Sequence, residues 1–159
     1  MQRAIIDYGR DADGDWYAVL DCSHNQHVRH RPPFTNRPWV STEAGRAEKL
    51  GAQLDCVRCD RFEWPDAPDA LEMYKRTADF DQDSVPKGLL AEHKTRAGVW
   101  GRIVIEQGML RYHVASMDVH CSLMPDAAGV IVPQLLHHVE VVGHVRFFVE
   151  FYKRLKTSG

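Results

Sequence analysis

The chain has 159 residues, of which 44% are hydrophobic and 26% are charged, and its net charge is −2. This composition is typical of a globular protein with enough apolar side chains for a core. It gives no support for the strongly basic surface of a general nucleic-acid-binding protein, and it leaves room for local basic patches. No apolar run reaches the roughly 20 residues that cross a membrane, and the first residues lack the apolar segment of a secretion signal. We therefore expect a cytoplasmic protein, in which cysteines stay reduced and serve as metal ligands, catalytic groups or core residues.

The first part of the chain predicts a small α+β domain. Two strands are expected over residues 2–8 and 16–20, joined by a turn rich in Asp and Gly, so that they form a hairpin. Thr42 can cap a helix over residues 43–50, and Gly51 is its natural end.

The second part of the chain predicts an all-β domain. Residues 64–68 (Trp-Pro-Asp-Ala-Pro) break any regular element, so we place the boundary there, with domains over residues 1–66 and 67–159. Short strands without a convincing helix predict an antiparallel sandwich or barrel, and hence a mainly β chain. The expected strands cover residues 100–106 and 109–114, with a hairpin turn at Gln107 and Gly108, and then residues 130–132, 139–142 and 145–152.

The cysteine spacing predicts a structural zinc site in the first domain. Cys22 and His24 can share one face of an extended segment, and Cys56 and Cys59 form a Cys-x-x-Cys pair further along the chain. Two such chelating pairs supply four ligands for a tetrahedral Zn²⁺, which would also stabilise a domain too small to bury much surface. His27 is the alternative to His24. A redox pair or plain core cysteines are the other interpretations.

Basic and aromatic residues follow the first chelating pair. Arg29, Arg31 and Trp39 could form a nucleic-acid or phosphate surface, because Arg pairs with phosphates and aromatic rings stack on bases. A solvated loop with Trp39 in the small core is the interpretation that we favour, since the whole chain is slightly acidic.

Motifs of the first domain resemble a small bacterial zinc-ribbon-like family of unknown function. The motifs occupy residues 14–16, 22–33, 37–39, 45–46 and 54–60. The resemblance spans about residues 2–63 and implies a zinc-ribbon-like fold, without an activity to transfer.

Motifs of the second domain resemble a cupin-like family that is linked to tellurite resistance in bacteria. They occupy residues 86–90, 93–95, 98–102, 133, 137–140 and 148–152. The resemblance spans about residues 72–153 and implies a compact antiparallel β-barrel or jelly roll that holds a small ligand or a metal in its mouth.

Within this second resemblance, a site is expected at His93, His137, Glu140 and Glu150. These residues could bind a small molecule or oxyanion, either directly or through a second divalent metal in the barrel. An Fe(II) oxygenase of the cupin type is the alternative, although the chain lacks the His-x-His pair of that class. A non-enzymatic module that binds nucleic acid or protein is the third hypothesis. The sequence assigns neither a reaction nor an oligomeric state.

Other titratable residues of the second domain are expected in structural positions. Cys121 lies in a strand-like run and is interpreted as a small core residue. His138 and His144 are expected on the surface.

Overall fold

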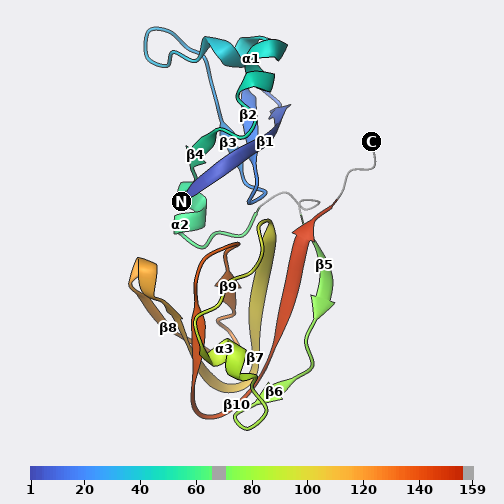
Figure 1. Cartoon of the computed structure of the whole chain (residues 1–159), viewed down its shortest axis with the longest axis vertical. Helices are drawn as coiled ribbons and strands as arrows, with labels where there is room; N and C mark the ends of the chain where they lie inside the picture. The colour runs from blue at the N-terminus through green and yellow to red at the C-terminus, as the bar shows by residue number, and fades with distance from the viewer. Residues whose placement is uncertain (66–70, 156–159) are drawn as a thin grey trace. The chain divides into compact units, whose positions relative to one another are not determined.

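A computed structural model describes residues 1–65 and 71–155 of the chain (Figure 1). The chain divides into two compact units, Met1–Asp66 and Ala67–Gly159, so the division falls where residues 66–70 lie outside the described part. Both units are mainly β, the first small and the second built on a larger sheet. No helix in the described ranges has the length and apolar character needed to cross a membrane.

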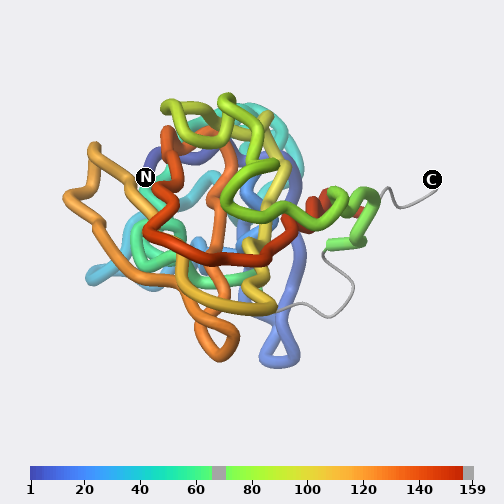
Figure 2. The backbone as a smooth tube through the Cα atoms, turned by 90° about the horizontal axis from the view of Figure 1, so that it is seen from below, coloured from blue at the N-terminus to red at the C-terminus, as the bar shows by residue number. Residues whose placement is uncertain are grey.

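Unit 1 contains a four-stranded antiparallel sheet in the order β3-β2-β1-β4. The predicted hairpin is confirmed, and Figure 2 shows its connection as a narrow blue loop. The predicted helix is also confirmed: the Thr42 hydroxyl accepts a hydrogen bond from the Gly45 amide at 3.1 Å, and the helix ends at Glu48. The elements are β1 (Gln2–Arg10), β2 (Trp16–Leu20), β3 (Asn25–His27), the 3-10 helix η1 (Pro38–Ser41), α1 (Glu43–Glu48), β4 (Gln53–Asp55) and α2 (Val57–Asp60).

The core of unit 1 is small. Its fully buried aliphatic side chains are Ile5, Ala18, Leu20, Val28 and Val40. The other buried side chains include three cysteines and one histidine, which belong to the candidate metal centre. A unit of this size buries little apolar surface, so a further source of stability is expected.

Unit 2 is built on a six-stranded antiparallel sheet in which β5, β10, β7 and β8 are neighbours in that order, while β6 pairs with β10 and β9 with β7. Two long strands, β7 and β10, pair along nearly their whole length and are seen side by side in Figure 1. The elements are β5 (Leu71–Arg76), β6 (Phe80–Asp81), α3 (Lys87–Leu90), β7 (Val99–Val114), the 3-10 helix η2 (Ala115–Met117), β8 (Val119–Leu123), β9 (Gly129–Ile131) and β10 (His138–Arg154).

The hairpin turn expected at Gln107 and Gly108 is wrong. Gly108 lies inside the continuous strand β7 and pairs with Val145 of β10. Its φ of 74° and its contact with the His144 carbonyl oxygen, which a Cβ would overlap, explain why glycine stands there. The two strands bend together at this point, because β10 carries an irregularity in the register between Val141 and Val145. The strands expected over 139–142 and 145–152 are therefore one strand.

The core of unit 2 lies on the inward face of this bent sheet. Trp100, Leu110 and Phe147 are fully buried, as the alternation of side chains along β7 and β10 requires. Cys121, which is expected in the core, is exposed on β8, a strand at the edge of the sheet. The prediction that Cys121 is a core residue is wrong, since an edge strand leaves part of each face uncovered.

Candidate metal centre and ligand cavity

The first chelating pair lies in a tight turn between β2 and β3. The Ser23 amide donates to the Leu20 carbonyl at 2.8 Å, and the Leu20 amide donates to the His24 carbonyl at 2.9 Å. Ser23 adopts a left-handed conformation with a φ of 68°. The turn, rather than the extended segment expected from the sequence, brings Cys22 and His24 to one side.

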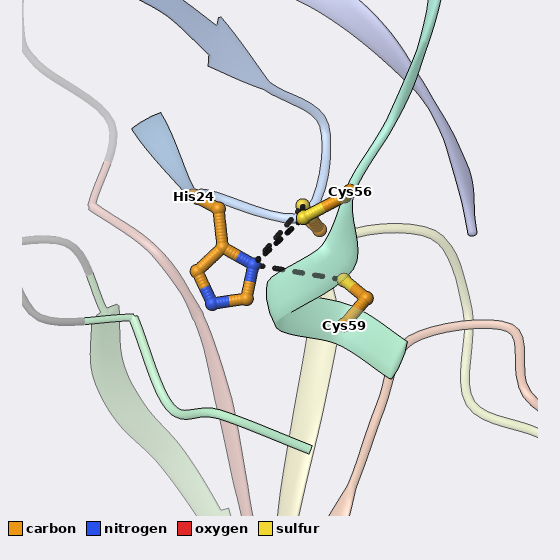
Figure 3. Close-up of side chains that lie close together, drawn as sticks. His24, Cys56 and Cys59 are labelled. Carbon is orange, nitrogen blue, oxygen red and sulfur yellow. Dashed lines mark hydrogen bonds between the residues drawn. The ribbon is translucent and has the colours of Figure 1, made fainter. Parts of the chain in front are cut away.

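The second chelating pair is held by the short helix α2. Cys56 precedes the helix and Cys59 lies inside it, with the Cys59 amide donating to the Cys56 carbonyl at 3.1 Å. Figure 3 shows both sulfur atoms on the side of the turn that faces the imidazole of His24.

The four side chains have the spacing of a tetrahedral zinc site. The His24 Nδ1 lies 3.5, 3.3 and 3.6 Å from the sulfur atoms of Cys22, Cys56 and Cys59, and the Cys22 and Cys56 sulfurs are 3.9 Å apart. Ligands on one tetrahedral Zn²⁺ are about 3.5 Å apart for sulfur and nitrogen and about 3.8 Å for two sulfurs, given Zn–S and Zn–N bond lengths. All four residues are buried, and their ligand atoms lie within 4.8 Å of one another. The donor set and its geometry therefore fit zinc.

The second nitrogen of His24 fixes the orientation of the ring. Nε2 donates to the Glu63 carbonyl at 3.0 Å, which leaves the lone pair of Nδ1 directed at the sulfurs. Arg58, which lies between the two cysteines of α2, holds this segment through the Glu63 carboxylate at 2.9 Å and the Trp64 carbonyl at 3.2 Å. The positioning role of Arg58 was missed from the sequence, because it depends on a contact that no local pattern encodes.

The thiols influence one another strongly. Donation from the Cys22 and Cys59 thiols holds the pKa of Cys56 far below its usual value, while donation to Cys56 raises the pKa of Cys22. The cluster thus concentrates negative charge on buried sulfur, where a dication would stabilise it.

His27, the alternative fourth ligand, lies outside this cluster. Its Nε2 is 2.8 Å from a carboxylate oxygen of Asp11, at the β1–β2 turn. The structure brings His24, and not His27, to the cysteines.

The residues considered for nucleic-acid contact are engaged within unit 1. Arg29 and Arg31 both pair with the carboxylate of Asp15, at 2.6 and 2.7 Å. The ring of Trp39 makes an edge contact with Tyr8 at 6.2 Å between centroids. The pairing with Asp15 compensates much of the positive charge that a phosphate would need.

Unit 2 contains a cavity of about 330 Å³. Apolar side chains from β7, β9 and β10 form much of its walls, and basic side chains and His93 also line it. The apolar walls include Ile103, Ile131, Val139, Phe147 and Val149, and the basic residues are Lys75, Lys94 and Arg96.

Two histidines line this cavity side by side. The backbones of His93 and His137 form a β-bridge, and their ring centroids are 4.3 Å apart. The Nδ1 of His93 donates to the Ala91 carbonyl and that of His137 to the Leu135 carbonyl, each at 2.9 Å, so Nε2 is the acceptor in the neutral form of each ring. Burial lowers the pKa of His137 to about 4, which keeps it neutral, and its Nε2 has no hydrogen-bond partner among the described residues.

The two glutamates expected beside these histidines lie elsewhere. Glu140 is 3.2 Å from the Nε2 of His113, and Glu150 accepts a hydrogen bond from the Tyr152 hydroxyl at 2.7 Å. Residues next to them in β10 line the cavity, and successive side chains of a strand point to opposite faces. The structure therefore brings together two of the four residues.

Two family models match different parts of the chain. Residues 6–63 match a family described as a protein of unknown function (DUF3565), and residues 75–149 match the TehB-like domain. These matches support a two-domain protein. Among curated proteins, none matches the chain.

Two solved structures are similar to part of the chain. TehB from Haemophilus influenzae is 22% identical, with a TM-score of 0.51 over 55% of this chain and 33% of that chain. A protein from Escherichia coli K12 is 20% identical, with a TM-score of 0.51 over 58% of this chain and 100% of that chain. The chain thus spans about a third of the length of the Haemophilus protein, and at these identities the likeness concerns the fold.

Proposed function

We propose that this protein is a cytoplasmic binding protein that takes a small anionic ligand into the cavity of unit 2. In this proposal, unit 1 is a zinc-ribbon-like module folded around one structural Zn²⁺, and unit 2 is a distant cupin-like barrel. The observation that carries the binding role is the cavity itself, which combines apolar walls with uncompensated positive charge.

The charge of the cavity lining supports an anion. Lys75, Lys94 and Arg96 line it, and none of the three has an ion-pair partner within the described ranges. Among residues 1–65 and 71–155, no carboxylate lines the cavity. A concave site that is lined by positive charges raises the local concentration of anions, and it binds them more strongly where water is partly excluded.

The two histidines indicate a further property of the ligand. Because each Nδ1 donates to a carbonyl, the neutral form of each ring presents Nε2 as an acceptor. A ligand that carries both a negative charge and an O–H or N–H group, such as a partly protonated oxyanion or a small hydroxy acid, satisfies cations and acceptors together. The apolar walls favour a ligand with an organic body.

A metal in this cavity is less well supported. Of the described residues, His93 and His137 alone would be its protein ligands, since Glu140 and Glu150 contact other groups. A facial set of two histidines and one carboxylate is what a non-haem iron oxygenase requires. Three nearby cations also disfavour a dication. The oxygenase alternative therefore lacks a third ligand.

The link to tellurite enters through the TehB-like match and defines one of the probes. In the binding test, the full chain is titrated calorimetrically with phosphate, benzoate and, in the absence of added thiols, tellurite, at constant ionic strength. We expect saturable binding of at least one of these anions. A double variant, Lys94→Gln with Arg96→Gln, should weaken it by about tenfold or more, because an effective pair energy of about 1.4 kcal/mol corresponds to that factor.

The matched control is Lys87→Gln, which removes an exposed charge of the same unit outside the cavity lining. Binding that is equally weakened in the control, or the absence of saturable binding for every probe, would overturn the proposal.

A further inference from the structure

Three histidines stand in register across neighbouring strands of unit 2. His113 of β7 is opposite His120 of β8 and also opposite His138 of β10. The ring of His113 lies 5.0 Å from that of His120 and is stacked on that of His138 at 4.7 Å, with 13° between the planes. We call these three residues the histidine ladder. It is separate from the cavity, whose lining includes none of them.

Two rings of the ladder present the same nitrogen to each other. The Nδ1 atoms of His113 and His120 are 2.7 Å apart. The opposite nitrogen of each ring faces a carboxylate: the Nε2 of His113 lies 3.2 Å from Glu140, and that of His120 lies 3.6 Å from Asp118. A carboxylate favours an N–H beside it, and the tautomer that carries its proton on Nε2 in both rings directs two Nδ1 lone pairs at each other.

Two Nδ1 atoms at this distance need a positive species between them, either a proton or a metal ion. We propose that this species is a divalent first-row transition metal, bound by the Nδ1 atoms of His113 and His120. Metal–nitrogen bonds of about 2.1 Å place two ligands that meet at a right angle, as in octahedral coordination, about 3 Å apart, so the rings need to move by only a few tenths of an ångström. Imidazole ligands suit Zn²⁺, Ni²⁺ and Cu²⁺.

The surroundings of the pair suit a metal in three respects. The carboxylates behind the rings form the carboxylate–histidine–metal arrangement, which fixes the tautomer and makes the ligating nitrogen more basic. A hollow of about 190 Å³ has both rings in its lining, so water can complete the coordination. Arg111, which also lines the hollow, lies 3.6 Å from Glu140, which offsets its positive charge.

This site differs in chemistry from the cluster of unit 1. Nitrogen and water ligands bind Ni²⁺ well, whereas three thiolates and one imidazole select Zn²⁺ in a closed tetrahedron. Ni²⁺ is therefore a probe that reports on the ladder while zinc stays in unit 1.

The test is a calorimetric titration of the zinc-loaded full chain with NiCl₂, while an indicator dye follows any release of zinc. We expect one Ni²⁺ site without zinc release. His113→Ala and His120→Ala should each weaken it by at least tenfold, whereas His144→Ala, which removes an exposed histidine of β10, should not change it.

A further variant distinguishes the loss of a metal ligand from damage to the fold. Glu140→Gln keeps both ligands and removes the carboxylate behind His113, and loss of such a partner is expected to cost 10–100-fold in metal affinity. Asp118→Asn should have a smaller effect, because its carboxylate is fully exposed and more distant. The proposal is overturned if Ni²⁺ does not bind, which would leave a proton shared between the rings, or if Ni²⁺ binds equally well to His113→Ala and His120→Ala.

Discussion

His24 of unit 1 and His137 of unit 2 are equally buried and hydrogen-bonded in the same way, but different groups face their second nitrogen. Both are 1% exposed, and each donates one ring N–H to a backbone carbonyl. The remaining nitrogen of His24 faces three cysteine sulfurs, whereas that of His137 has no hydrogen-bond partner among the described residues. A buried, oriented imidazole is thus common to both units and does not by itself identify a ligand.

The charged groups around each imidazole decide the difference. Three cysteine thiols surround His24, and their ionised forms are stabilised by a dication. The described residues that line the cavity beside His137 include three basic side chains and no carboxylate, and this arrangement favours an anion. In the proposed function, the same histidine chemistry therefore serves a cation in unit 1 and an anion in unit 2.

The largest expected effect is the loss of structure in unit 1 when the metal is removed. Structural zinc sites of this type contribute on the order of 10 kcal/mol at neutral pH, more than a unit with so small a core can lose. A strong chelator, or Cys59→Ser, should abolish the slow amide hydrogen exchange of β1 and β2. Cys121→Ser is the control, because this cysteine is exposed and lies in the other unit. Persistence of slow exchange in metal-free protein would show that zinc is not structural.

The next effect concerns the pH dependence of unit 2. Burial lowers the pKa of His137 from 6.5 to about 4, so the unfolded chain binds its proton first as the pH falls. This contribution to stability is complete above pH 6.5 and is lost between pH 6.5 and 4, by up to about 3 kcal/mol. Denaturant unfolding monitored in unit 2 measures it. The slope against pH should be shallower in His137→Gln, and an identical slope would contradict the assignment.

A smaller effect is expected where β7 bends. Gly108→Ala places a Cβ against the His144 carbonyl in a backbone with a φ of 74°, which should cost about 2 kcal/mol through strain and repulsion. The matched control is Gly88→Ala in α3, where the added methyl meets open space and a helix prefers alanine. Thermal unfolding compares the two variants, and equal stabilities would argue against the bend.

The smallest effect is expected at the group that supports His24. Arg58→Gln removes the contacts that hold the Glu63 segment and should weaken zinc binding by about tenfold, at the low end of the range for such partners. Competition with a zinc indicator measures the affinity. Arg61→Gln is the control, since its guanidinium is exposed and 3.8 Å from Glu63. Similar losses in both variants would reduce the role of Arg58 to its charge alone.

The elements confirmed from the sequence are those that depend on local chemistry. The Thr42 cap and the β1–β2 hairpin depend on residues close together in the chain, and the two chelating pairs could be read from their spacing. Gly108 was misread because Gln-Gly has the composition of a turn, whereas its conformation depends on β10, which lies far along the chain.

The faces of β10 could have been predicted more fully. Val145, Phe147 and Val149 alternate along the strand and are buried, so Glu150 must point to the opposite face. The histidine ladder could not have been found in this way, since it requires the register among β8, β7 and β10. Long-range pairing, rather than residue type, limits what the sequence discloses.

The contrast between the two units is tested most directly by the metal content of the full chain, purified under reducing conditions without a metal-affinity step. We predict about one zinc per chain, which is lost in Cys59→Ser and retained in His137→Gln. Absence of zinc from the wild-type protein would contradict the metal centre of unit 1. A second metal that disappears in His137→Gln would contradict the assignment of the cavity to an anion.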